Sequence, residues 1–134
     1  MQQSVLVVDD DPLTRRVLQH YLARAGYGVL SASNGCEAIK LANSKMPQLI
    51  ILDVMMPDMD GWTALKQIQQ TEAGKAIPAI LLSGNPDLVA KDESLHSGAA
   101  SVLVKPVRAE QLLALIRQLM PESGPDGPPA KLPV

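Results

Sequence analysis

The chain has 134 residues, of which 46% are hydrophobic and 19% are charged, and its formal net charge is −2. This length and composition fit one soluble domain with a single core, and the weak negative charge gives no support for direct binding to nucleic acid or to an anionic membrane. No apolar run is long enough to cross a bilayer, and no secretory signal precedes the first predicted strand. Cys36 is the only cysteine, so an internal disulfide is excluded and we expect a reducing, cytoplasmic compartment.

Five short apolar runs predict buried β-strands, and the segments between them predict helices. The predicted strands cover residues 4–8, 27–32, 49–53, 77–83 and 101–104. The predicted helices run from 12 to the glycine at 26, from 34 to about 44, onward from 61, from about 85 to the glycine at 98, and through 112–119. We therefore expect one domain over residues 1–120. Residues 121–134 are rich in Pro and Gly and should form a flexible tail or linker.

Residues that favour helix starts occur where the helices are predicted to begin. Asp11 is followed by Pro12, a pair typical of an N-cap and a first helical residue. Asn34 and Glu37 have the spacing of a capping box. Arg108 stands at the cap position of the last helix and is a poor cap.

Several other side chains have ordinary structural interpretations. Leu13, Val17, Leu18 and Leu22 recur at helical spacing and predict the buried stripe of the first helix.

Other expectations concern single side chains. Trp62 should lie in the core, and Cys36 should be buried or half buried in the second helix. His20 and His96 should lie on the surface, and Asp58 and Asp60 should be turn and cap residues of the third helix.

Strands that alternate with helices predict a doubly wound α/β fold with a five-stranded parallel sheet and five helices. Of the common strand orders, 2-1-3-4-5 suits five strands, and its switch point lies between strands one and three. Polar residues stand at four strand ends, and all of them should meet at one edge of the sheet. They are Asp9 and Asp10 after the first strand, Asp53 at the end of the third, Ser83 at the end of the fourth and Lys105 after the fifth.

Three carboxylates from two adjacent strand ends repel one another unless a cation lies among them. Oxygen ligands without His or Cys favour Mg²⁺ over zinc, and Mn²⁺, which takes similar ligands, is the expected substitute. Lys105 adds a second positive charge to the same cavity. Such a site is suited to transfer of a phosphoryl group onto Asp53, with Ser83 in a position to hydrogen-bond a phosphoryl oxygen.

Five short signatures carry these residues: VVDDD at 7–11, LDVMMPDMDG at 52–61, ILLSG at 80–84, SGA at 97–99 and VKP at 104–106. In this order, and at strand ends, they make the chain resemble the receiver domain of two-component response regulators, in the CheY-like superfamily. The resemblance covers residues 4 to about 120. It implies a flavodoxin-like receiver that acts as a phosphorelay switch, with only autophosphorylation and autodephosphorylation activity, rather than as a turnover enzyme.

The resemblance also implies a role for each site residue. Asp53 would accept a phosphoryl group from a phosphohistidine of a sensor histidine kinase or phosphotransfer protein. Asp9, Asp10, Asp53 and the backbone carbonyl of Met55 would hold Mg²⁺, Ser83 and Lys105 would contact the phosphoryl group, and the Lys105–Pro106 bond would be cis. A downstream protein, or a missing C-terminal output domain, would bind the surface formed by the fourth helix, fifth strand and fifth helix.

Two positions depart from the pattern of many receivers. Val102 stands where many receivers have an aromatic ring that turns inward on activation. Coupling from Ser83 to the surface of the fifth strand must therefore use backbone and aliphatic shifts. Met55, two residues after Asp53, cannot orient a hydrolytic water, which predicts slow loss of phosphate.

Three other functions compete with the switch. A flavin-binding flavodoxin needs a phosphate-binding loop after the first strand. This chain has Asp9, Asp10 and Asp11 there, which repel phosphate in the absence of a metal. A phosphatase with an aspartate nucleophile expects a second acid at the position of Met55. The remaining alternative is an unphosphorylated receiver-like scaffold, which has no physical need to hold repelling carboxylates. Whether the chain acts alone or is the front piece of a longer regulator stays open.

Overall fold

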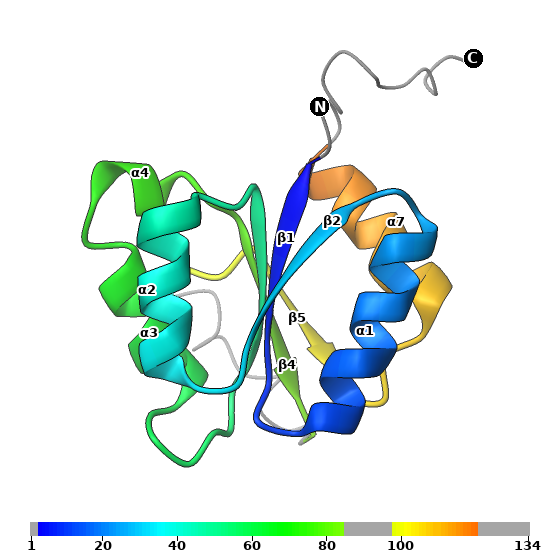
Figure 1. Cartoon of the computed structure of the whole chain (residues 1–134), viewed down its shortest axis with the longest axis horizontal. Helices are drawn as coiled ribbons and strands as arrows, with labels where there is room; N and C mark the ends of the chain where they lie inside the picture. Colours follow the sequence, from blue (N-terminus) through cyan, green and yellow to red (C-terminus); the bar gives the residue numbers. More distant parts are fainter. Residues whose placement is uncertain (1–2, 85–97, 121–134) are drawn as a thin grey trace.

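The computed structural model describes residues 3–84 and 98–120. Its five strands form one parallel sheet in the order β2-β1-β3-β4-β5, which confirms the prediction (Figure 1). The strands are β1 (Ser4–Val8), β2 (Gly28–Ala32), β3 (Leu49–Asp53), β4 (Ala79–Ser83) and β5 (Ser101–Val104). Every residue of β3 and β4 is buried, because these strands are covered on both faces, and this explains their continuous apolar sequences.

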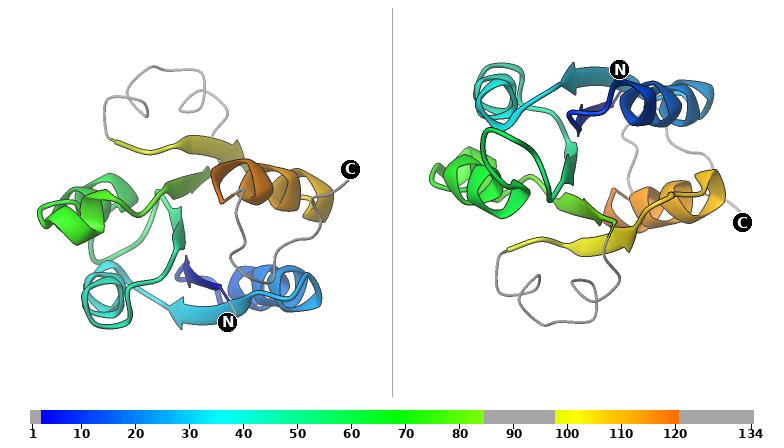
Figure 2. Two further views of the ribbon diagram at one scale, coloured as in Figure 1. Left: turned by 90° about the horizontal axis from the view of Figure 1, so that it is seen from above. Right: turned by 90° about the horizontal axis from the view of Figure 1, so that it is seen from below.

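Helices cover both faces of the sheet (Figures 1 and 2). On one face lie α1 (Pro12–Arg24) and α7 (Ala109–Leu119), and on the other lie α2 (Gly35–Lys45), α3 (Gly61–Ile68) and the single-turn α4 (Glu72–Lys75). The alternation of side chains along β1 and β3 divides the core between the faces: Leu6 and Ile50 belong to the cluster under α2 and α3, and Val7 and Ile51 to the cluster under α1 and α7. None of the helices in the described part of the chain is long and apolar enough to cross a membrane.

One helix of the structure was not expected from the sequence. This is α4, which begins after Thr71, whose hydroxyl accepts a hydrogen bond from the Gly74 N–H at 2.9 Å. A single turn carries too little periodicity to be recognised in a sequence. The predicted fourth helix, starting at about residue 85, lies outside the described residues, as does the predicted tail.

The N-cap residues of α1 and α2 agree with the sequence, but the capping box of α2 does not. The Asp11 side chain accepts a hydrogen bond from the Leu13 N–H at 3.2 Å, with Pro12 as the first helical residue. The Asn34 side chain accepts one from the Glu37 N–H at 2.8 Å. The Glu37 carboxylate, however, accepts from the Ser33 N–H rather than from that of Asn34. As expected of a poor cap, Arg108 makes no side-chain capping bond.

The predicted buried stripe of α1 is only half correct. Leu18 and Leu22 are fully buried, but Leu13 is 66% exposed and Val17 is 38% exposed. The first turns of α1 lie at the sheet edge, where β1 has already ended, so they have no strand beneath them. Leu13 and Val17 instead line a surface groove of about 450 Å³ between α1 and the residues that follow β5.

Two further side chains correct or refine the sequence analysis. Cys36 is exposed, because it lies in the first turn of α2 on the side away from the sheet. Trp62 is only partly buried, and it packs against the core cluster under α2 and α3. His20 lies on the surface as expected, and His96 is outside the described residues.

Candidate active site

The register of the parallel sheet brings the predicted site residues to one edge. Val8 of β1 pairs with Leu52 of β3, so the residues that follow, Asp9 and Asp53, stand side by side where these strands end. In the next pair of strands Asp53 itself lies opposite Leu82 of β4. Asp9 and Asp53 are therefore neighbours at the switch point of the fold, where ligands of doubly wound sheets bind.

Three acids form a compact cluster at this point. Asp9, Asp10 and Asp53 each offer a carboxylate oxygen, and these oxygens all lie within 4.8 Å of one another. Asp9 is 0% exposed and Asp53 is 3% exposed, whereas Asp10 is open to solvent. Two buried carboxylates at this separation repel each other strongly unless positive charge lies between them.

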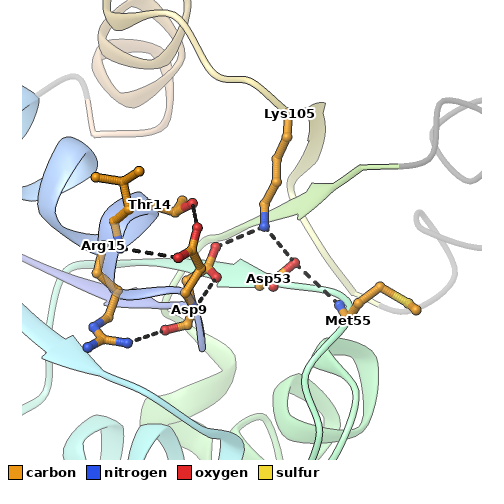
Figure 3. Close-up of polar contacts among 8 residues, drawn as sticks. Asp9, Thr14, Arg15, Asp53, Met55 and Lys105 are labelled. Carbon is orange, nitrogen blue, oxygen red and sulfur yellow. Dashed lines mark hydrogen bonds and ion pairs between the residues drawn. The ribbon is translucent and has the colours of Figure 1, made fainter.

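Lys105 supplies part of that charge from the end of β5. Its ammonium lies 3.0 Å from Oδ2 of Asp9 and 3.3 Å from Oδ1 of Asp53, so it bridges the two buried acids (Figure 3). The Lys105–Pro106 peptide bond is cis, as the resemblance implied. One ammonium beside three carboxylates leaves the site with a net negative charge.

The pKa shifts follow from this arrangement. Burial and then the negative charge of Asp9 raise the pKa of Asp53 from 3.8 to about 6, against the opposing effects of the Lys105 ammonium and the Met55 N–H. Burial would lower the pKa of Lys105, but its hydrogen bond to Asp9 and the charge of Asp53 outweigh burial and raise that pKa above 10.5. Lys105 is therefore firmly cationic, and Asp53 is the acid that bears the cost of crowding.

The backbone around Asp9 is held by a residue that the sequence analysis did not single out. The Arg15 guanidinium, from the first turn of α1, donates a hydrogen bond to the Asp9 carbonyl at 2.7 Å (Figure 3). The Asp9 side chain in turn accepts from the Asp11 N–H at 3.0 Å. The spacing of Arg15 from Asp9 suits a side chain that folds back from a helix start, but many surface arginines share that spacing.

The loop from residue 54 to residue 60 forms the other wall of the site. The Met55 N–H donates to Oδ1 of Asp53 at 3.3 Å, and the Met55 side chain is 67% exposed. The Gly61 N–H donates to the Val54 carbonyl at 2.8 Å and closes the loop at its base. A Cβ at Gly61 would overlap the Asp53 carbonyl, so only glycine allows the loop to return this close to β3.

Ser83 is fully buried at the end of β4. It pairs in register with Val104, and its carbonyl accepts from the Lys105 N–H at 2.8 Å. The structure thus places Ser83 on the strand next to Asp53 and ties its backbone to that of Lys105. Its contact with a phosphoryl group remains a prediction.

The residues present fit a hard divalent cation. Among the residues that the structure describes, the donor set is made of carboxylate oxygens, with neither His nor Cys in the cluster, and this is the chemistry that Mg²⁺ and Mn²⁺ prefer. A cation there would also relieve the repulsion that Lys105 only partly offsets. The arrangement defines a doubly wound α/β domain with an acidic pocket at its switch point.

Comparison with known proteins identifies the family. Residues 5–117 match the response regulator receiver domain. Response regulator MprA of Mycobacterium sp. (strain KMS) is 37% identical over 132 residues, which are 96% of this chain and 56% of that protein. The chain therefore belongs to the receiver domain family of two-component signal transduction, whose members are signalling switches rather than classical enzymes. It spans little more than half the length of that relative.

Two solved structures illustrate the likeness. Chemotaxis protein CheY4 of Vibrio cholerae superimposes with a TM-score of 0.82 at 34% identity, covering 89% of this chain and 99% of that one. The receiver domain of sensor histidine kinase PA1611 from Pseudomonas aeruginosa PAO1 gives a TM-score of 0.82 at 27% identity, covering 91% of this chain and 100% of that one. The latter structure has a magnesium ion coordinated in its active site cleft.

Proposed function

We propose that Asp53 accepts a phosphoryl group, in a Mg²⁺-dependent reaction, from a phosphohistidine of a sensor histidine kinase or phosphotransfer protein. The observation that carries the proposal is the convergence of Asp9, Asp10, Asp53 and Lys105, which creates a negative, partly buried pocket beside a fixed ammonium. The chain belongs to a family whose members interact with histidine kinases and with downstream partners. A pocket of acids beside a fixed ammonium suits the transfer of a phosphoryl group.

In the proposed reaction an ionised Asp53 oxygen attacks phosphorus in line with the leaving group. A P–O bond to Asp53 forms as the P–N bond of the phosphohistidine breaks, and the electron pair leaves with the imidazole nitrogen. Asp9, Asp10, Asp53 and the Met55 carbonyl would hold Mg²⁺, which would supply positive charge to the equatorial phosphoryl oxygens. Lys105 would exchange its ion pair with Asp53 for one with the phosphoryl group, and Ser83 would donate its hydroxyl hydrogen to another oxygen.

The new contacts of Ser83 and Lys105 would exist only in the phosphorylated state, and this difference is what a switch requires. We propose that the change is transmitted to a partner-binding surface that includes β5 and α7. Val102 of β5 is half buried against the core cluster under α2 and α3, so transmission would use aliphatic packing instead of an aromatic ring. The partner would be a downstream protein or an output domain of a longer chain.

The test is an intact-mass measurement after incubation with acetyl phosphate. The wild-type chain should gain one phosphoryl group with Mg²⁺ and none in EDTA, and Asp53→Asn should gain none in either condition. Asp60→Asn is the matched control, because it changes another aspartate, the N-cap of α3, and should still be phosphorylated. A folded wild type that binds Mg²⁺ but gains no mass from acetyl phosphate or from a phosphorylated kinase would favour the unphosphorylated scaffold.

A further inference from the structure

Asp58 contacts a helix other than the one that the sequence analysis assigned to it. It lies in the loop between β3 and α3, but its carboxylate accepts hydrogen bonds at the start of α2. The Gly35 N–H lies 3.1 Å from Oδ1 and 3.0 Å from Oδ2, and the Cys36 N–H lies 3.2 Å from Oδ2. Asp60 alone caps α3, accepting from the Thr63 N–H at 2.8 Å.

These bonds complete the start of α2. Asn34 already accepts from the third N–H of the helix, and Asp58 accepts from the first two, Gly35 and Cys36. The N–H groups at a helix start have no acceptor within the helix, and they favour a nearby negative charge. Burial is the largest single effect on the pKa of Asp58 and raises it, but the backbone hydrogen bonds from Gly35, Cys36 and Met59 together outweigh burial and lower that pKa below 3.8. Asp58 is therefore ionised at neutral pH.

A packing contact accompanies the polar one. A Cβ at Gly35 would overlap the side chain of Met59, so the loop rests directly on the backbone of α2. Met59 also packs against the core cluster under α2 and α3. The outer part of the loop is thus attached to α2 by one charged and one apolar side chain.

The attachment matters because of what the same loop carries. Its base is fixed by the Gly61 N–H to Val54 carbonyl bond, and its exit by the Asp60 cap. Between the base and Asp58 lie only three residues, the first of which is Met55. The Met55 N–H is bound to the Asp53 carboxylate, so the position of this short segment determines where the Met55 carbonyl stands.

We propose that Asp58 is a positioning residue for the metal site: by capping α2 it fixes the segment that carries Met55 before the cation binds. This inference rests on the proposed Mg²⁺ site. Asp58 does not belong to the cluster of acids that could hold the ion. Its loss would remove no ligand residue, but the cation would then have to order the loop on binding, and ordering a flexible segment weakens affinity.

The experiment measures Mg²⁺ affinity by titration calorimetry at constant ionic strength. The variants are Asp58→Ala, Asp58→Asn, which keeps an acceptor oxygen but removes the charge, and Asn34→Ala, which removes a cap of the same helix but leaves the loop attached. We expect Asp58→Ala to raise the Mg²⁺ dissociation constant about tenfold, the scale of losses for residues that orient metal ligands. Asp58→Asn should stay within about threefold of the wild type, and Asn34→Ala should lower the melting temperature without changing the dissociation constant.

Three results would overturn the inference while leaving the proposed function intact. The first is an unchanged dissociation constant in Asp58→Ala. The second is an equal loss of Mg²⁺ affinity in Asn34→Ala, which would assign the effect to helix stability. The third is an equal loss of Mg²⁺ affinity in Asp58→Asn, which would assign the effect to charge near the cation. A wild-type chain that binds no Mg²⁺ would instead overturn the proposed metal site itself. Asp58 is exposed, so its substitution should not prevent folding.

Discussion

Burial of Asp53 beside Asp9 should make the metal-free protein less stable as the pH rises. The pKa of Asp53 is about 6 in the folded chain and 3.8 as its reference value. Between these two pH values the folded state binds the proton more tightly than the unfolded state, so stability falls as pH increases through this window. Replacing Asp53 with Asn, which has no proton to lose, should abolish this part of the pH dependence.

The size of the effect follows from the shift. A rise of roughly two pKa units corresponds to about 3 kcal/mol at 1.36 kcal/mol per unit. Because the acidic cluster opens to solvent at Asp10, we take about 2 kcal/mol as the expected difference. The metal-free Asp53→Asn variant should therefore gain about 2 kcal/mol over the wild type between pH 4 and pH 7.5, or about 7 °C in melting temperature for a domain of this size.

The assay is urea unfolding in EDTA at several pH values between 4 and 7.5, with Trp62 fluorescence as the signal. At each pH the free energy of unfolding of the wild type is subtracted from that of Asp53→Asn, and the change of this difference with pH is the result. The subtraction is needed because other carboxylates titrate in both proteins. Glu110→Gln, which removes an exposed carboxylate at the start of α7, is the control and should show no such change. Parallel pH profiles for Asp53→Asn and wild type would refute the crowding argument. Mg²⁺ should reduce the difference, because it stabilises the folded state that holds ionised Asp53.

Three further predictions concern the same site. Asp10→Asn should raise the stability of the metal-free protein by about 1 kcal/mol, because it removes one repelling charge, and should weaken Mg²⁺ binding; equal unfolding free energies for the two metal-free proteins would contradict the crowded cluster. Met55→Asn should lose its phosphoryl group several times faster than the wild type, measured by mass spectrometry after removal of the phosphodonor, because an amide can orient water; an unchanged rate would count against that role. Gly61→Ala should cost about 2–4 kcal/mol of stability, measured by urea unfolding, because its Cβ would overlap the Asp53 backbone; a loss below about 1 kcal/mol would mean that the loop moves aside easily.

The helix starts show where sequence reasoning is reliable and where it is not. Asp11 and Asn34 cap the helices that directly follow them, because the bonds span two or three residues and depend on local geometry alone. Asp58 lies three residues before the start of α3, yet it caps α2, 23 residues away in the chain. Only the packing of the loop against α2 brings that pair together.

The same distinction explains the exposed residues of α1. Leu13 and Val17 follow helical spacing as well as Leu18 and Leu22 do, but spacing reports only which residues share a face. Whether a strand lies beneath that face depends on where the sheet ends. Arg15 was missed for a related reason, because its bond to the Asp9 carbonyl forms only when the turn between β1 and α1 has folded.

The sequence by itself predicted the strand order, the edge at which the polar residues meet and the acids of the pocket. Apolar runs that alternate with helices predict a parallel sheet whose strands end at a common edge, and the strand order is one of the common orders of doubly wound folds, so none of this needs coordinates. The tertiary structure alone decided that Asp9 and Asp53 are buried while Asp10 is open, that Lys105 bridges the two buried acids, and that Asp58 joins the site to α2. Burial and contact between distant segments are properties of the packed chain, because they depend on which surfaces the other elements cover.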